Sequence, residues 1–300
     1  MFAVKVPATS ANLGPGFDTM GLALELYLEV QLEIKSSRDI ELYFNGDDKE
    51  IIDNKPEDNL LIRAMNRVFQ ESGREMPGLR LTVENRIPFG KGLGSSAAAI
   101  VAGVHAADFL LEQRFSRKQL LKWAVEMEGH ADNIVPAVAG GLTTVMLYDG
   151  QVYFQKLDFP DEIELIVAIP DFNLPTEKAR SILPEKIELK KTVANLQRAC
   201  FFLASIYNSD FNSINMAMDD TIYQPLRKQF IPGFEQVLHE AGNSGALGVA
   251  LSGAGPSILA FTINNKEVIG EAMQRAFKAN GINSRIIYLR ANNSGVKIFT

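Results

Sequence analysis

The sequence has 300 residues, of which 46% are hydrophobic and 22% charged, and this composition is typical of a globular protein with two domains or one elaborate domain. The net charge of −6 gives no basic footprint for a polyanion, so we expect no nucleic-acid partner. Cys200 is the only cysteine, which excludes an intrachain disulfide or a thiolate metal cluster and suits a reducing, cytoplasmic location.

The N-terminal segment MFAVKVPATS lacks the charged, apolar and small-residue regions of a signal peptide. The most apolar helix candidate, AAAIVAGVHAADFLL at 97–111, contains His105 and Asp108 and is too short to span a bilayer. We therefore expect no membrane partner.

In the first half, apolar residues occupy every even position from Leu22 to Ile34, which predicts a long half-buried antiparallel strand. A second alternating run, LRLTVENRI at 79–87, predicts another strand. Apolar residues between 60 and 69 share one helical face, a second helix follows residue 94, and Ser116 with Gln119 form a capping box for a third that ends at Gly129. The first half therefore combines antiparallel strands with three helices.

Strands are predicted at 142–148, 152–157 and 163–170, and the loop DFNLP at 171–175 suggests a boundary between domains at 1–170 and 171–300. A helix follows, with one apolar face made by Val193, Leu196, Ala199, Cys200 and Leu203. The chain then continues as strand (247–251), strand (258–263), helix (266–279) and strand (284–290), so the predicted fold class is α+β.

The segment PFGKGLGSSAA at 88–98 places three glycines between a strand and a helix. Glycine lets backbone N–H groups turn toward one point, and Ser95 and Ser96 begin a helix whose N-terminus favours an anion such as a phosphate chain. The loop matches neither a Walker A motif nor a dinucleotide fingerprint. Taken alone, it is equally consistent with close packing of a helix on a sheet.

Three further segments accompany this loop: PATSANLGPGFDTMGLAL at 7–24, HADNIVPAVAGG at 130–141 and LSGAGPSILAF at 251–261. Together the four segments resemble the motifs of the GHMP small-molecule kinases. The resemblance implies an N-terminal domain like domain 2 of ribosomal protein S5, a ferredoxin-like C-terminal domain and a site between them. It also implies ATP and Mg²⁺ as cofactors, and it is closest to the members that phosphorylate the side-chain hydroxyl of L-homoserine, on the route to threonine.

The same resemblance implies roles for individual residues. Ser96 and Glu128 are similar to the magnesium ligands, although Glu126 is close enough in sequence to be an alternative. Asn59 resembles an adenine contact, and a helix N-cap explains it equally well. The ATP phosphate loop would consist of Pro88, Phe89, Gly90, Lys91, Gly92, Leu93, Gly94, Ser95, Ser96, Ala97 and Ala98.

On the acceptor side, an acid suits an amine and guanidinium groups suit a carboxylate, as an amino-acid zwitterion requires. Asn133 would orient the hydroxyl of the substrate. Asp132 is a general-base candidate by residue type, but we expect it to be structural and bonded to nearby backbone N–H groups. The positions that resemble substrate contacts are Asn12, Asp18, His130, Asn133, Thr176, Arg180 and Arg227.

Two alternatives remain at this point. Another GHMP kinase could act on a different small alcohol such as mevalonate. A non-enzymatic, RNA-binding S5-like protein is disfavoured by the acidic composition. A homodimer is a possible assembly.

Overall fold

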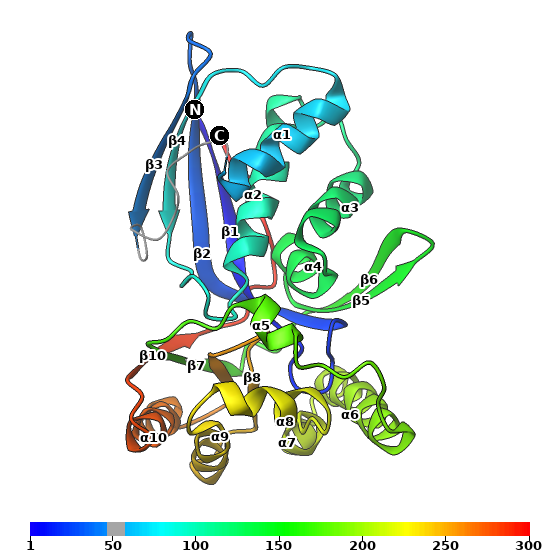
Figure 1. Cartoon of the computed structure of the whole chain (residues 1–300), viewed down its shortest axis with the longest axis vertical. Helices are drawn as coiled ribbons and strands as arrows, with labels where there is room; N and C mark the ends of the chain where they lie inside the picture. The colour runs from blue at the N-terminus through cyan, green and yellow to red at the C-terminus, as the bar shows by residue number, and fades with distance from the viewer. Residues whose placement is uncertain (47–57) are drawn as a thin grey trace.

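The computed structural model describes residues 1–46 and 58–300. Two antiparallel-rich sheets, each with its own helices, are stacked along the long axis of the molecule (Figure 1). The α+β class predicted from the sequence is therefore confirmed. No helix in these two ranges is long and apolar enough to cross a membrane.

The first sheet is built around strand β2 (Met20–Ile34), whose alternating apolar residues are buried as predicted, except that Leu26 is half-buried and Ile34 at the end is 67% exposed. Its strand order is β11 (Lys297–Phe299), β1 (Phe2–Ala11), β2, β4 (Leu79–Asn85) and β3 (Ile40–Gly46). The other end of β2 pairs with β5 (Leu142–Tyr148), which forms a hairpin with β6 (Gln151–Leu157). Strand β2 is antiparallel to β1, β4 and β5, whereas β3 is parallel to β4.

Four helices accompany this sheet: α1 (Leu60–Ser72), α2 (Ser95–Leu110), α3 (Arg117–Glu128) and α4 (Ala131–Ala139). The predicted capping box at Ser116 and the left-handed C-cap at Gly129 are both present in α3. The prediction of three helices missed α4. Every residue of α4 is buried and Pro136 lies inside it, so this helix has no amphipathic period to detect.

The second sheet is fully antiparallel, in the order β10 (Ser284–Leu289), β7 (Glu164–Pro170), β9 (Ile258–Thr262) and β8 (Gly248–Leu251). Helices α9 (Phe234–Asn243) and α10 (Lys266–Ala279) share a second hydrophobic core with this sheet. The strands and the helix predicted beyond residue 246 are confirmed. Between β7 and α9 lie α5 (Thr176–Arg180), α6 (Leu189–Tyr207), α7 (Ile214–Ala217) and α8 (Tyr223–Arg227).

Sheet membership divides the chain differently from the predicted boundary at 170/171. Strand β7 lies before that boundary but belongs to the second sheet, and β11 lies after it but pairs with β1. The domains at 1–170 and 171–300 therefore stay a prediction.

The apolar face predicted for the helix after residue 190 is only partly covered, since Ala199 and Leu203 pack against the first hydrophobic core while the other three residues are exposed. Val193 is 43% exposed, Leu196 is 63% exposed, and Cys200 is also exposed. The buried side of α6 consists of Asn195, Phe202, Ser205 and Ile206 instead. Amphipathic spacing identified the shared face, but it does not show how much of that face is covered.

Candidate active site

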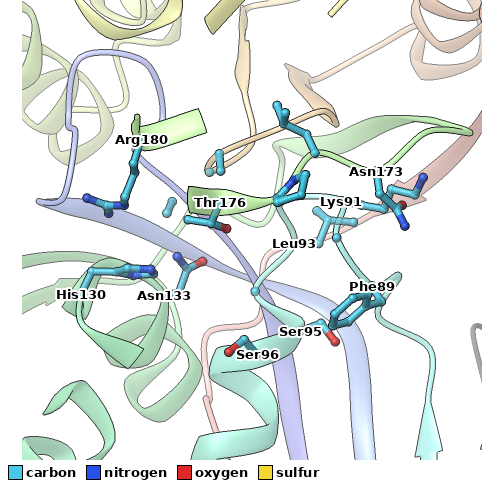
Figure 2. Close-up of a pocket in the computed structure, with 18 of the residues that line it drawn as sticks. Phe89, Lys91, Leu93, Ser95, Ser96, His130, Asn133, Asn173, Thr176 and Arg180 are labelled. Carbon is cyan, nitrogen blue, oxygen red and sulfur yellow. The ribbon is translucent and has the colours of Figure 1, made fainter. Parts of the chain in front are cut away.

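A cavity of about 480 Å³ opens where the two sheets meet. Figure 2 shows its walls: Ser95 and Ser96 at the start of α2, His130 and Asn133 beside them, and Thr176 and Arg180 across the gap. Of the positions predicted for the site, the cavity is lined by Asn12, Pro88, Phe89, Gly90, Lys91, Gly92, Leu93, Gly94, Ser95, Ser96, Glu128, His130, Asp132, Asn133, Thr176, Arg180 and Arg227. Segments far apart in sequence therefore converge on one site.

The glycine loop turns its backbone carbonyl groups toward the protein. Four consecutive carbonyl oxygens, from residue 90 to residue 93, accept hydrogen bonds from Leu174 N, Ser257 N, Ser252 Oγ and Thr9 N. Within the described part of the chain, the N–H groups of residues 92–96 donate to no acceptor. Five unpaired N–H groups at the N-terminus of the 16-residue helix α2 make a binding place for an anion.

Two glycines of this loop cannot be replaced without displacing their neighbours. Gly92 and Gly94 have φ values of +73° and +72°, in the left-handed region. A Cβ on Gly92 would overlap the backbone of Ser252, and one on Gly94 would overlap the Thr9 hydroxyl. The residues thus form a cradle that only bare backbone can line, which fits a bound phosphate chain.

Ser96 and Glu128 meet at the edge of this cradle. The Ser96 hydroxyl donates to Glu128 Oε2 over 2.6 Å, and the Glu128 side chain is only 11% exposed. Burial raises the pKa of the Glu128 carboxyl, although the hydrogen bond from Ser96 opposes the shift. Glu126 instead forms surface ion pairs with Arg67 and Lys122 and does not line the cavity.

A hydroxyl and one carboxylate are hard oxygen donors of the kind that Mg²⁺ accepts, with phosphate oxygens and water completing the coordination. The described residues contain no group of three or more His, Cys, Asp or Glu side chains that could hold a metal ion without such help. The donor set therefore fits Mg²⁺ bound together with a phosphate chain.

Beside the loop, Asn133 is held by two side chains. The buried Thr9 hydroxyl donates to Asn133 Oδ1 over 2.8 Å, and Asn133 Nδ2 lies 3.4 Å from Asp132 Oδ1. These two contacts fix the orientation of the amide, so its N–H₂ group is the part that can face a ligand.

Asp132 has side-chain rather than backbone partners. Its Oδ1 atom also lies 3.0 Å from His130 Nδ1, and none of the described backbone N–H groups donates to it. The expected bonding of Asp132 to backbone N–H groups was therefore wrong. Burial lowers the pKa of His130, but the hydrogen bond to Asp132 and the charges of Asp132 and Glu128 outweigh burial and raise it overall.

Arg180 forms a two-pronged ion pair with Asp18 at 2.6 and 3.0 Å. This pair raises the pKa of the Arg180 guanidinium, against the opposing effect of burial. Asp18 does not itself line the cavity, but it reaches the site through Arg180. The pair uses both carboxylate oxygens of Asp18 and both terminal nitrogens of Arg180, whereas the Nε–H of Arg180 remains for a ligand.

Arg227 is 3% exposed and donates only to the carbonyl oxygens of Ala179 and Gly253. No carboxylate among the described residues pairs with it. Burial, followed by the charge of Arg180, lowers the pKa of Arg227. Because buried charges in proteins are normally paired, an unpaired guanidinium in a cavity wall points to an anionic ligand.

Not every predicted residue reaches the cavity. Asn59 caps α1 by accepting from Leu61 N and Ile62 N, as its alternative interpretation proposed, and Ala97 and Ala98 are buried in α2. Asn12 lines the cavity, but its amide is used by Gly253 O and by the N–H of Asp18.

Sequence reasoning missed side chains that hold the cavity residues in place without lining the cavity themselves. Thr9 was not singled out, although it lies in a quoted motif. Phe17 stacks on Tyr223 with ring centroids 3.9 Å apart, and the Arg180 and Arg227 guanidinium groups lie 5.3 and 5.2 Å from the Phe17 ring. Phe17 also lies in a quoted motif, but no spacing pattern connects it to two arginines more than 160 residues away.

Comparison with protein families gives two matches. The family model described as GHMP kinases N terminal domain matches residues 59–141, and the one described as GHMP kinases C terminal matches residues 202–283. The glycine loop and the cavity thus lie in a small-molecule kinase of the GHMP class.

Individual relatives narrow this class. The homoserine kinase of Halothermothrix orenii is 41% identical over 99% of this chain and 96% of its own length, and that of Aquifex aeolicus is 40% identical over the whole of both chains. The crystal structure of homoserine kinase from Cytophaga hutchinsonii superposes with a TM-score of 0.90, at 34% identity, over 99% of this chain and 97% of the other. The chain belongs to the GHMP kinase family, in its homoserine kinase group.

These matches confirm the two-domain GHMP kinase fold, the kinase activity and the use of ATP with Mg²⁺. A mevalonate kinase structure superposes with a TM-score of 0.72 at only 16% identity, which shows a shared fold.

Proposed function

We propose that this kinase transfers the γ-phosphoryl group of ATP to the side-chain hydroxyl of L-homoserine, giving O-phospho-L-homoserine on the route to threonine. The observation that carries the proposal is one cavity with two separate anion sites. The N–H cradle of residues 92–96 suits a phosphate chain, and the unpaired guanidinium of Arg227 suits the carboxylate of an amino acid.

For the nucleotide, the cradle would bind the phosphate chain, and Ser96 and Glu128 would hold Mg²⁺ through their oxygens. Mg²⁺ there would neutralise charge on the phosphate oxygens. Lys91 does not act as a Walker-type lysine, since its Nζ donates to the carbonyl oxygens of Pro170 and Phe172 and ties the loop to the second sheet. Charge stabilisation therefore depends mainly on the metal, the backbone N–H groups and the dipole of α2.

For the acceptor, Arg227 binds the carboxylate and Arg180 supports it from the facing wall. His130 provides a hydrogen-bonding group for the amine, and Asp18 acts through the ion pair that holds Arg180. Mevalonate also carries a carboxylate, so the arginines alone do not exclude it. The relationship to homoserine kinases across the full chain favours the amino acid.

The acceptor hydroxyl meets the amide N–H₂ of Asn133, which donates to the hydroxyl oxygen and cannot accept its proton. The oxygen forms its bond to the γ-phosphorus as the bond from phosphorus to the ADP oxygen breaks. The hydroxyl proton passes late to the transferred phosphoryl group, because a loose transition state needs little activation of the nucleophile. Asp132 positions His130 and Asn133.

The rest of the proposal concerns setting and assembly. We propose that the enzyme works in the cytoplasm as a homodimer. We also propose domains at 1–170 and 171–300, in which β7 of the first domain joins the second sheet and β11 of the second domain joins the first sheet. The kinase relatives do not favour the RNA-binding alternative.

The test measures ADP release with homoserine, homoserine amide, serine, threonine and mevalonate as acceptors, with and without Mg²⁺. We expect kcat/KM to be highest for homoserine by at least about tenfold, and activity to require Mg²⁺. A preference for mevalonate, or homoserine amide reacting as well as homoserine, would contradict the substrate assignment.

A further inference from the structure

Phe17 lies in the loop between β1 and β2, and both arginines of the acceptor side approach its ring. The Cζ atoms of Arg180 and Arg227 lie 5.3 and 5.2 Å from the ring centroid. These arginines belong to α5 and α8, two helices that follow the last strand of the N-terminal half (Figure 1). One side chain next to the first sheet therefore contacts both cations of the acceptor wall.

The ring is fixed by its neighbours. It stacks on the ring of Tyr223, with centroids 3.9 Å apart and planes inclined by 17°. Tyr223 precedes Arg227 by four residues in α8, so that the two side chains lie about one helical turn apart on the same side of that helix. The backbone N–H of Asp18 donates to Asn12 Oδ1 over 3.1 Å, which holds the loop beside the ring. The position of Phe17 is thus set by α8 and by its own loop.

The surroundings of Phe17 differ from those of a core residue. Within residues 1–46 and 58–300, neither Phe17 nor Tyr223 belongs to the two hydrophobic cores. Phe17 is half-buried and does not line the cavity. A ring that only fills space would lie among apolar side chains, whereas this one lies beside two guanidinium groups. Its neighbours indicate an electrostatic function.

Two like charges in one wall need a group that holds them together. The charge of Arg180 adds to the effect of burial in lowering the pKa of Arg227. Asp18 neutralises Arg180, but no carboxylate of the described residues pairs with Arg227. The face of an aromatic ring carries partial negative charge and attracts a guanidinium group within about 6 Å of its centroid.

A ring also leaves the hydrogen-bond donors of the arginine available. Arg227 donates through Nε and Nη1 to two carbonyl oxygens, and its Nη2 group has no acceptor among the described residues. A carboxylate in place of the ring would occupy such donors, as Asp18 does with the terminal nitrogens of Arg180. Phe17 therefore stabilises the cations without filling the site for the anion that they bind.

We propose that Phe17 is a positioning residue that holds the guanidinium groups of Arg180 and Arg227 for the acceptor, and that it thereby determines the preference of this kinase for an acceptor with a carboxylate group. It acts through the two arginines and not by touching the substrate. The inference rests on the proposed function, in which these arginines bind the carboxylate of homoserine.

The first test compares homoserine with homoserine amide, which lacks the negative charge. Phe17→Leu keeps an apolar side chain but removes the ring, and circular dichroism shows whether the variant is folded. We expect kcat/KM for homoserine to fall about 5- to 30-fold through a higher KM, because two partly buried cation–π contacts are lost. The KM for ATP and kcat/KM for the amide should change by less than about twofold. Phe17→Tyr is the matched control, since it retains the ring and should retain the preference for homoserine.

The second test keeps the shape of the side chain and changes only its charge distribution. Phenylalanines with one, two and three fluorine atoms are placed at position 17, where each fluorine withdraws electron density from the face of the ring. We expect the KM for homoserine to rise with each added fluorine, because the attraction of the ring for the guanidinium groups weakens. This series answers the question even if Phe17→Leu does not fold.

Two results would overturn the assignment of Phe17 while the proposed function stands. Phe17→Leu could lower kcat/KM equally for homoserine and its amide, or the whole fluorinated series could show the wild-type KM for homoserine; either result would make Phe17 a packing residue. A wild-type enzyme that uses homoserine amide as well as homoserine would instead contradict the proposed function, and the assignment of Phe17 would fail with it.

Discussion

The hydroxyl of Thr9 is the group through which we expect the first sheet to control the chemistry. Thr9 is fully buried in β1, and its hydroxyl donates to Asn133 Oδ1 over 2.8 Å. Replacing Thr9 with Val keeps the volume and the β-branch but removes this donor. The amide of Asn133 is then free to rotate, and it no longer presents its N–H₂ group to the acceptor hydroxyl.

The size of the effect follows from that hydrogen bond. A buried acceptor left without its donor costs about 1–3 kcal/mol. If Asn133 is displaced from its catalytic orientation by this amount, kcat falls about 5- to 150-fold. The KM for ATP should change little, because the bond from Thr9 N to Leu93 O, which holds the phosphate loop, is made by the backbone and survives the substitution.

Steady-state ADP release with homoserine and ATP varied separately measures both parameters. Thr9→Ser is the matched control, since it keeps the hydroxyl and should retain kcat within about threefold. In a double-mutant cycle, Thr9→Val should add little to Asn133→Ala, because both act through one amide. A folded Thr9→Val enzyme with unchanged kcat, or fully additive effects in the cycle, would refute the positioning role.

Three further predictions concern the metal, the substrate carboxylate and pH. Ser96→Ala and Glu128→Gln should each lower kcat about a hundredfold in folded protein, whereas Glu126→Gln should leave kcat unchanged. If only Glu126→Gln lowered kcat, the assignment of Glu128 as the metal ligand would be wrong. Arg227→Leu should raise the KM for homoserine by a factor that corresponds to about 1.5–3 kcal/mol of lost binding free energy, with the KM for ATP unchanged. An unchanged KM for homoserine would contradict carboxylate binding by Arg227. Burial lowers the pKa of His105 to about 4, so this side chain takes up a proton on unfolding between pH 7 and pH 4. Over that range the free energy of unfolding of the wild type should fall by about 3 kcal/mol more than that of His105→Gln. Urea titrations in which both proteins lose the same free energy of unfolding would exclude this.

The sequence predicted elements whose determinants are local. The alternation in β2 and the capping box of α3 each depend on residues within one segment, and both are present. Strand β1 was not recognised, because Thr9 and Ser10 make it resemble a polar loop although both are buried. Both hydroxyls can be buried because they form hydrogen bonds with side chains far away in the sequence, Thr9 with Asn133 and Ser10 with Ser252.

The same distinction holds at the site. Glycines at 90, 92 and 94 indicated a loop with accessible backbone, but alone they were equally consistent with an anion site and with close packing of a helix on a sheet. The partner of Thr9, in contrast, is 124 residues away, and the orientation of Asn133 depends on it. Motif resemblance identified which segments meet in the cavity, but the pairing of Asp18 with Arg180 became visible only from the structure.

The hydrogen bonds of the glycine loop explain why the site needs both sheets. Its carbonyl oxygens are held by Thr9 of the first sheet and by Leu174, Ser252 and Ser257, which adjoin strands of the second. Because a peptide unit that points its carbonyl oxygen inward points its N–H group outward, contacts to both sheets together aim the N–H groups at the cavity. Arg227 reaches the same cavity through Gly253, in the loop that also contacts Asn12. The glycine loop and the cavity wall that holds Arg227 are therefore built on a single set of contacts between the two sheets, so that a change in the relative position of the sheets would alter both at once.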